Sequence, residues 1–146
     1  MRALGVDLGS HRIGLAISDS GGIIASPLSV LKRSKSRRHD LEEIARIARL
    51  EEVEIIVVGL PLSMSGAIGP AAKGATEEAE RLATVVDVPV VLHDERLTTV
   101  SADRSMKEAN LRAPQRRQIV DKVAAAIMLQ AWLDHRTGNQ IHGTQR

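Results

Sequence analysis

The chain has 146 residues, of which 43% are hydrophobic and 26% are charged, and its formal net charge is +2. This length and balance are typical of one globular domain and exclude a disordered chain. The absence of cysteine excludes a disulfide scaffold, a thiolate zinc site and a cysteine nucleophile. No apolar run reaches the roughly 20 residues that a membrane-spanning helix needs. We therefore expect a cytoplasmic α/β protein without a membrane partner.

Trp132 is the single aromatic residue of the chain. Proteins that hold single-stranded nucleic acid generally stack its bases on aromatic side chains. If this protein binds nucleic acid, we therefore expect it to do so through charge and backbone geometry.

The N-terminal part of the chain has the pattern of three strands joined by short turns. Residues 3–8 form an apolar run, residues 12–19 alternate, and residues 23–31 follow a Ser-Gly-Gly turn. Short turns between successive strands predict an antiparallel meander. Because Pro27 cannot donate to a strand ladder, we expect the third strand to lie at an edge of the sheet.

Helices and strands alternate along the rest of the chain. Helices are expected from Asp40, over 71–86 and over 115–135, with a short helix after Thr98 or Thr99, and β-branched runs predict buried strands at 54–59 and 88–93. This order predicts a mixed sheet with helices on both faces, in a single domain over residues 1–135. Residues 136–146 lack periodicity and are expected to form a disordered tail.

Two acidic residues stand where the pattern is otherwise apolar. Asp7 lies inside the first expected strand, where burial of an unpaired carboxylate is costly. A salt bridge to a neighbour such as Arg12 would explain it without a function. Asp121 lies on the apolar stripe of the last expected helix, although its charge also complements the start of that helix. Both are candidates for a site and for a structural role.

Asp94 and Glu95 follow the strand expected over residues 88–93. Ligands of α/β proteins collect at the carboxyl ends of such strands. Adjacent side chains point to opposite faces of a sheet, so we expect one of the two to face Asp7. The strand is apolar on both faces, and the pattern leaves the choice between them open.

Carboxylates that converge on one cleft repel each other unless protons or cations lie between them. Oxygen ligands without His or Cys favour Mg²⁺ or Mn²⁺ over zinc. Two such ions about 4 Å apart support in-line hydrolysis of phosphodiester bonds, since one activates water and the other stabilises the leaving oxygen. The acidic residues therefore indicate phosphodiester hydrolysis with two divalent ions.

Four motifs, in this order, resemble the YqgF/RuvX family. They are GVDLG at 5–9, GLPL at 59–62, DERLTT at 94–99 and VDKVAA at 120–125. The resemblance extends from about Arg2 to Leu133. Members of this family are described as pre-16S rRNA nucleases and as Holliday junction resolvase-like proteins with a ribonuclease H-like fold.

The resemblance implies a five-stranded mixed sheet in the order 3-2-1-4-5. It also implies that Asp7, Glu95 and Asp121 are the catalytic residues and metal ligands, with Asp94 as a candidate fourth ligand. The implied function is a metal-dependent endonuclease that processes the 5′ end of pre-16S rRNA during ribosome biogenesis. Ser63 and Ser65 depart from the family, which often carries Asn and Asp in this loop.

Several basic residues are expected to contact a nucleic acid. Arg12 and Arg96 lie beside the acidic motifs, where they would hold a phosphate or neutralise the carboxylates. The other candidates precede Asp121 or lie in a basic segment that could also be a solvated loop: Arg112, Arg116, Arg117, Lys32, Arg33, Lys35, Arg37 and Arg38.

The expected partner is structured RNA first and branched DNA second. A Holliday junction resolvase is the alternative; it makes two symmetric cuts and so needs a homodimer, whereas a monomer suffices for RNA. A non-catalytic module that binds nucleic acid, ribosome-assembly factors or transcription factors is a further alternative. Residues 7–10 (DLGS) also resemble the phosphate-binding hairpin of actin-like ATPases, but this chain is too short to supply the two domains that clamp ATP.

Overall fold

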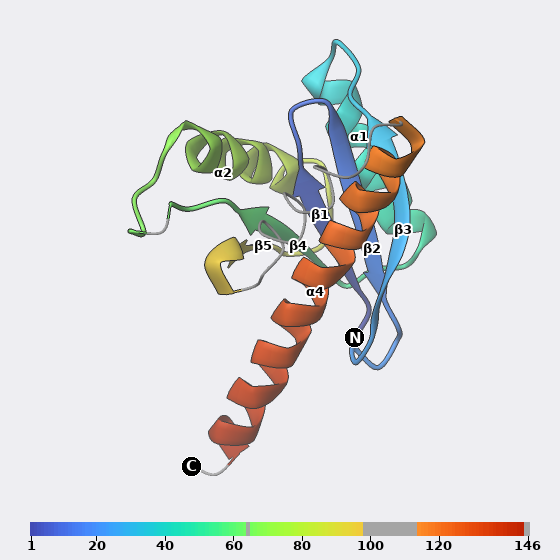
Figure 1. Ribbon diagram of the computed structural model, residues 1–146. Helices are drawn as coiled ribbons and strands as arrows, with labels where there is room; N and C mark the ends of the chain where they lie inside the picture. Colours follow the sequence, from blue (N-terminus) through green and yellow to red (C-terminus); the bar gives the residue numbers. More distant parts are fainter. Residues whose placement is uncertain (64, 98–113, 145–146) are drawn as a thin grey trace.

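The computed structural model describes residues 1–63, 65–97 and 114–144 (Figure 1). The strands are β1 (Ala3–Leu8), β2 (Arg12–Ser18), β3 (Ala25–Lys32), β4 (Ile55–Leu60) and β5 (Val90–Asp94). The helices are α1 (Arg37–Leu50), α2 (Pro70–Ala83) and α4 (Pro114–Thr144), and a short 3-10 helix, η1 (Glu95–Leu97), follows β5. None of the described helices is long and apolar enough to cross a membrane.

The strands form one mixed sheet in the order β3-β2-β1-β4-β5. β1 pairs with β2 and β2 with β3 in antiparallel fashion, whereas β4 runs parallel to both β1 and β5. The predicted meander and strand order are confirmed. β3 lies at an edge, as Pro27 predicted, and the register between β2 and β3 shifts by one residue at Pro27.

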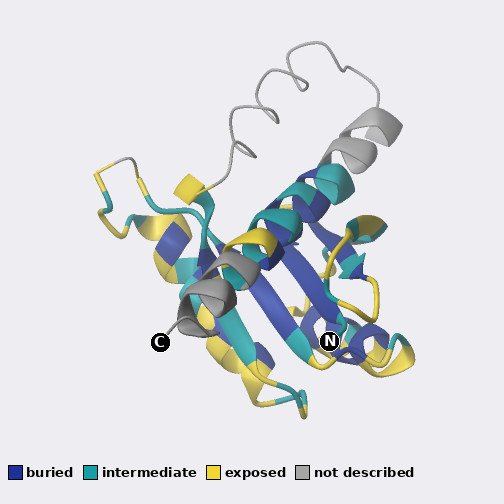
Figure 2. Cartoon of the chain, turned by 90° about the horizontal axis from the view of Figure 1, so that it is seen from below, coloured by how far each residue is buried: buried dark blue, intermediate teal, exposed yellow. Residues whose placement is uncertain are grey.

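Helices cover both faces of the sheet, as Figures 1 and 2 show. Leu4 and Val6 of β1 belong to the core beneath α1 and α2. The intervening residues of β1 face α4: Ala3 belongs to the core beneath that helix, and a Cβ at Gly5 would lie 2.9 Å from the Cβ of Leu129. Small residues on this face let α4 approach the sheet closely.

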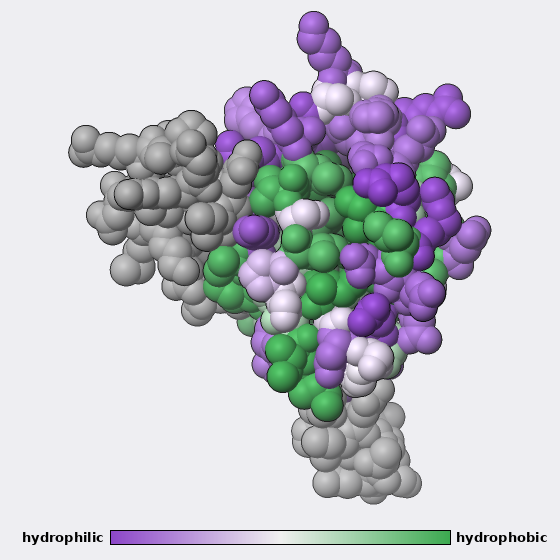
Figure 3. All heavy atoms as spheres, turned by 90° about the vertical axis from the view of Figure 1, so that its right-hand side faces the viewer, coloured by the Kyte–Doolittle hydropathy of each residue, from purple (hydrophilic) through white to green (hydrophobic). Residues whose placement is uncertain are grey.

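The edge strand β3 is only partly covered. Ile23 and Ile24, in the turn before it, are 67% and 60% exposed. Figure 3 shows apolar side chains gathered on this side of the molecule. Gln130 of α4 ties the turn to the helix, because its side chain accepts a hydrogen bond from the Ala25 amide and donates one to the Ile23 carbonyl.

Strand β5 differs from its prediction as a buried strand. It lies at the other edge of the sheet, and Leu92 is 39% exposed. The apolar run gave no sign of the edge position, because α2 and α4 pack against opposite faces of β5 and both faces carry apolar residues. The expected short helix after Thr98 lies outside the described residues.

Two helices extend beyond their expected bounds. α1 begins at Arg37 rather than Asp40, because the Ser36 hydroxyl caps it by accepting a hydrogen bond from the His39 amide at 3.1 Å. Apolar periodicity cannot detect this polar first turn. α4 continues past His135 to Thr144, so its backbone is helical where the missing periodicity predicted a disordered tail. An established helix can continue without an apolar stripe, because extension costs far less than nucleation.

Candidate active site

Asp7 lies within a row of residues that crosses four strands. It pairs with Gly14 of β2, and the register between β1 and β4 places Gly59 on its other side. Gly59 in turn pairs with His93 of β5. Side chains of one row project from the same face of a sheet, and this is the face that α4 covers. Asp7 therefore has a glycine on each side.

The two glycines leave room for the other candidate acids. A Cβ at Gly14 would lie 2.4 Å from the main-chain oxygen of Asp121, and a Cβ at Gly59 would lie 2.7 Å from Oε1 of Glu95. A side chain at either position would collide with these groups. The row thus brings Asp121, from α4, and Glu95, from η1, to the two sides of Asp7. Sequence reasoning gave no role to these glycines, although a glycine within a strand pattern indicates a close approach.

Charge at this row is balanced by Arg12. Its Nε donates a 2.6 Å hydrogen bond to Oδ2 of Asp121, and the two side chains are 25% and 13% exposed. Arg12 is the first residue of β2, one short turn after Asp7. Of the two roles expected for Arg12, neutralising a carboxylate is the one observed here, and phosphate contact stays a prediction. Asp7 itself is 7% exposed.

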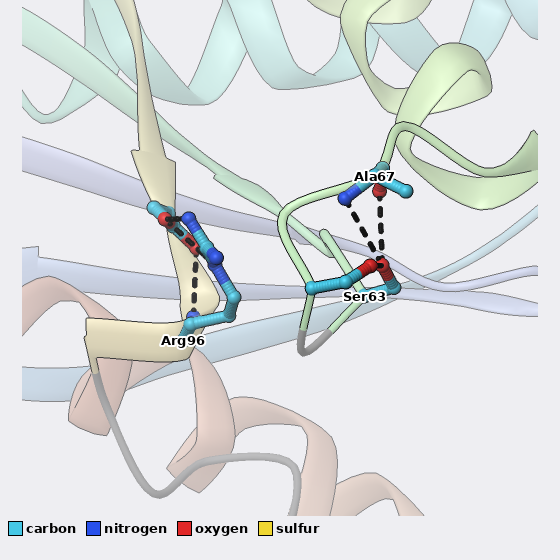
Figure 4. Close-up of polar contacts among 5 residues, drawn as sticks. Ser63, Ala67 and Arg96 are labelled. Atoms are coloured by element: carbon cyan, nitrogen blue, oxygen red, sulfur yellow. Dashed lines mark hydrogen bonds and ion pairs between the residues drawn. The ribbon is translucent and has the colours of Figure 1, made fainter.

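Asp94 is held by Arg96 rather than directed at Gly59. The Arg96 guanidinium contacts both carboxylate oxygens of Asp94 at 2.6–3.1 Å, and the Arg96 amide donates to Oδ1 at 2.9 Å (Figure 4). The side-chain hydrogen bond from Arg96 lowers the pKa of Asp94. Glu95 therefore occupies the row, and a metal-binding role for Asp94 stays a prediction.

The loop between β4 and α2 lies next to Arg96. Gly66 has a positive φ of 86°, and a Cβ there would lie 3.1 Å from Nη1 of Arg96. The Ser63 hydroxyl accepts a hydrogen bond from the Ala67 amide at 3.1 Å and lies 2.9 Å from the Ser65 hydroxyl (Figure 4). The two serines therefore brace the loop where the family often carries Asn and Asp.

His93 continues the row at the edge strand. It is 4% exposed, and its Nε2 has no hydrogen-bond partner in the part of the chain that the structure describes. Its ring lies 6.3 Å from that of His135 on α4. Burial, with a smaller effect of His135, lowers the pKa of His93, so the imidazole is neutral at neutral pH.

Asp7, Glu95 and Asp121 suit a hard divalent cation, since they offer carboxylate oxygens. The spacing is not that of a loaded site: among the described residues, no group of three or more His, Asp or Glu side chains is arranged to hold a metal ion. Asp121 instead binds the guanidinium of Arg12. The residues therefore fit such an ion in their chemistry, and Asp121 would have to exchange Arg12 for it.

Arg33, one of the predicted nucleic-acid contacts, is engaged within the fold. Its guanidinium forms two 2.8 Å hydrogen bonds with Glu78 of α2, and its Nε donates to the Gly9 carbonyl at 2.7 Å. The hydrogen bonds that Arg33 donates to Glu78 are the main cause of a raised pKa for Arg33. The pair holds the turn between β1 and β2 against α2.

The other predicted basic contacts are spread over several elements. Arg37 and Arg38 form the exposed first turn of α1, Lys32 ends β3 and Lys35 lies between these two elements. Arg116 and Arg117 lie in the first turns of α4. Arg112 is outside the described residues. Their contacts with nucleic acid stay predictions.

Comparisons with known proteins agree on the family and the fold. The RuvX family model, described as Holliday junction resolvase, matches residues 1–135. Mycobacterial relatives carry the name "Putative pre-16S rRNA nuclease". The relative from Mycobacterium ulcerans (strain Agy99) is 46% identical over 136 residues, 92% of this chain and 79% of its own length. The relative from Mycobacterium tuberculosis (strain H37Ra) is 47% identical over 145 residues, 99% and 84% of the two lengths.

The similar solved structures include RuvC of Thermus thermophilus. RuvC in complex with a Holliday junction substrate superposes with a TM-score of 0.60 at 18% identity, over 94% of this chain and 96% of RuvC. A second RuvC structure gives a TM-score of 0.55 at 16% identity, over 94% and 97%. The fold is therefore that of RuvC, which confirms the expected ribonuclease H-like architecture.

Proposed function

The chain belongs to the RuvX family, and on this premise we propose that it is a metal-dependent endonuclease that hydrolyses phosphodiester bonds in structured nucleic acid. One observation carries the proposal: the glycines on both sides of Asp7 admit Glu95 and Asp121 to its row. A fold that only needed a stable sheet would gain by filling this row with apolar side chains, because converging carboxylates cost stability.

Asp7, Glu95 and Asp121 would hold Mg²⁺ or Mn²⁺, two ions in the full arrangement. When bound, such ions activate a water molecule and stabilise the leaving oxygen. The protein supplies the rest: Asp7 is fixed on the central strand, and Arg12 neutralises Asp121 until an ion takes its place. Arg96, fixed by Asp94 at the edge of the site, is the candidate for holding the scissile phosphate.

The substrate we propose is structured RNA, at the 5′ end of pre-16S rRNA during ribosome biogenesis. The names of the mycobacterial relatives support RNA. With such a substrate, the protein would act in the cytoplasm, together with ribosome-assembly factors. The family description as Holliday junction resolvase supports a branched DNA substrate as the second candidate. That activity would need a homodimer, because a resolvase makes two symmetric cuts.

A cleavage assay at low salt tests the proposal. Wild type, Asp7→Asn and the exposed control Asp87→Asn are incubated with an rRNA-precursor duplex, a single-stranded RNA and a four-way DNA junction, each with Mg²⁺, Mn²⁺ or EDTA. We expect wild type and Asp87→Asn to cut only with metal, and Asp7→Asn not to cut. The preferred substrate decides between rRNA processing and junction resolution. Binding without cutting by all three proteins would refute the nuclease and favour a non-catalytic module.

A further inference from the structure

A basic surface lies on the face of the sheet opposite α4. Between α1 and the end of α2 there is a cavity of about 330 Å³, lined by Arg37, Arg38, Leu41, Arg81, Thr84 and Val85. We call it the arginine cavity. Its floor is formed by Leu41, which belongs to the core beneath α1 and α2, and by the half-buried Val85.

The arginine cavity carries three positively charged side chains. None of the described residues that line it is acidic. Arg38 pairs with Glu42 at 3.0 Å on the open surface, where the two side chains are 87% and 52% exposed, so this pair is weak. Arg37 and Arg81 form no ion pair with any residue that the structure describes. Exposed guanidinium groups that line one cavity create a positive potential that attracts anions.

A second cavity, of about 340 Å³, adjoins the first through Arg37, which lines both. Its other walls include Gly9 and Ser10, in the turn directly after the strand of Asp7. Arg33 and Glu78 also line it, but they neutralise each other. Arg37 and the exposed Ser10 hydroxyl are therefore the groups left to attract an anion. Together the two cavities form a path from the end of β1 to the end of α2.

We propose that this path, which begins at the turn after β1, binds the phosphodiester backbone of the nucleic-acid substrate, with Arg37 and Arg81 as the phosphate contacts. The inference rests on the proposed function and adds to it. Guanidinium groups match phosphate oxygens with paired hydrogen bonds. Two adjoining cavities suit a chain of phosphate groups better than they suit a single phosphate group. No aromatic side chain lines either cavity, so the contacts are with the backbone and not with stacked bases.

Sequence analysis did not identify Arg81. It lies in a helix that also carries Glu77, Glu78 and Glu80, so that the local charge is acidic. Its role depends on its position across from the first turn of α1, which only the fold reveals.

Fluorescence anisotropy in EDTA measures binding without cleavage. The probes are a labelled rRNA-precursor duplex and a labelled four-way junction. Each is titrated at salt concentrations between about 50 and 200 mM KCl, because a protein that makes several phosphate contacts loses roughly 10³–10⁵ in affinity over this range. The variants are Arg37→Gln and Arg81→Gln. Arg49→Gln is the matched control, because it removes the same charge from α1 next to the acidic Glu52 and Asp87. Melting temperatures of all variants confirm that they fold.

We expect Arg37→Gln and Arg81→Gln to weaken binding roughly threefold to tenfold at low salt, and to reduce the slope of log affinity against log salt by about 1 each. Arg49→Gln should bind like wild type. Equal affinities for all variants would overturn the proposal. So would tight binding of a free mononucleotide or inorganic phosphate that Arg81→Gln abolishes while nucleic-acid affinity is unchanged, because the cavity would then hold a small ligand.

The proposed function and this inference can fail separately. If wild type cuts with metal and Arg81→Gln binds nucleic acid with unchanged affinity, the proposed path is refuted and the proposed nuclease activity is not. A wild type that never cuts, although Arg81→Gln loses affinity, refutes the nuclease and supports the path.

Discussion

The guanidinium of Arg12 lies 2.6 Å from the carboxylate of Asp121, although 109 positions separate the two residues in sequence. The pair joins the start of β2 to α4 next to Asp7, inside a row that otherwise gathers negative charge. Arg12 therefore does part of what a metal ion would do there, because it offsets repulsion among the acids. An ion that binds Asp121 competes with this pair.

Replacing Arg12 tests that competition. Both side chains are partly buried, so Arg12→Gln should cost about 1–2 kcal/mol in the free energy of unfolding in EDTA, between the values for exposed and buried pairs. The gain in stability on adding Mn²⁺ should be larger than in wild type, because no ion pair is lost. Urea unfolding with and without Mn²⁺ measures both effects. Arg38→Gln, which breaks an exposed pair, is the control and should cost less than about 1 kcal/mol. An equal Mn²⁺ effect in wild type and Arg12→Gln would show that Arg12 does not compete with the ion.

The glycine at position 59 should matter for activity more than for folding. A Cβ in Gly59→Ala meets the end of the Glu95 side chain, which can turn away. We therefore expect this variant to lose most of its metal-dependent cleavage. Its free energy of unfolding should stay within about 1 kcal/mol of the wild-type value. Cleavage assays and urea unfolding on the same preparation check this. Full activity would mean that Glu95 is not needed where the structure places it.

The glycine at position 14 should matter for folding. A Cβ in Gly14→Ala meets the main chain of Asp121, and α4 would have to move to admit it. The expected cost is about 1–3 kcal/mol in the free energy of unfolding, from overpacking. Gly74→Ala in α2 is the control, since apart from its chain neighbours and the nearby backbone of α2 no described residue lies within 4 Å of its Cβ. It should gain up to about 1 kcal/mol from helix propensity. A Gly14→Ala variant as stable as wild type would contradict the close packing of α4 on β2.

Much of this fold follows from local pattern. Short turns predicted the meander, and Pro27 predicted the edge position of β3. The strand order came from the family resemblance, because periodicity does not say which side of β1 receives β4. Alternation could not choose between Asp94 and Glu95, since η1 begins at Glu95 and ends the strand geometry on which the rule depends.

The sequence pattern could not predict ion pairs between residues that are distant in sequence. Residues 32–38 contain five basic residues and no acidic one, yet Arg33 among them is neutralised by Glu78, 45 positions away. Arg37, in the same segment, faces a cavity with Arg81. Which member of a charged segment is structural and which is free depends on the packing of α2 against α1.

Arg33 should therefore behave as a structural residue. Its side chain and that of Glu78 are 17% and 8% exposed, and loss of one partner leaves a buried charge. Arg33→Gln should cost about 3 kcal/mol or more in the free energy of unfolding, measured with urea. Glu78→Gln should cost a similar amount. If Arg33→Gln instead weakens RNA binding with stability unchanged, the residue contacts the nucleic acid as its place in a basic segment first indicated.

The Asp7→Asn variant distinguishes the effect of Asp7 on metal binding from its effect on the stability of the fold. Asp7 is 7% exposed and has Glu95 and Asp121 on its two sides, so removing its charge should relieve repulsion and raise the melting temperature in EDTA by roughly 2–4 °C, about 1 kcal/mol for a chain of this size. Wild type should gain about 2.7 kcal/mol when Mn²⁺ is present at 100 times its dissociation constant, and the variant should gain almost nothing. Thermal unfolding across a Mn²⁺ series measures this, with Asp87→Asn expected to follow wild type. Equal Mn²⁺ shifts in wild type and Asp7→Asn would exclude Asp7 as a ligand. The row would then be an acidic surface neutralised by Arg12, which is what a non-catalytic module requires.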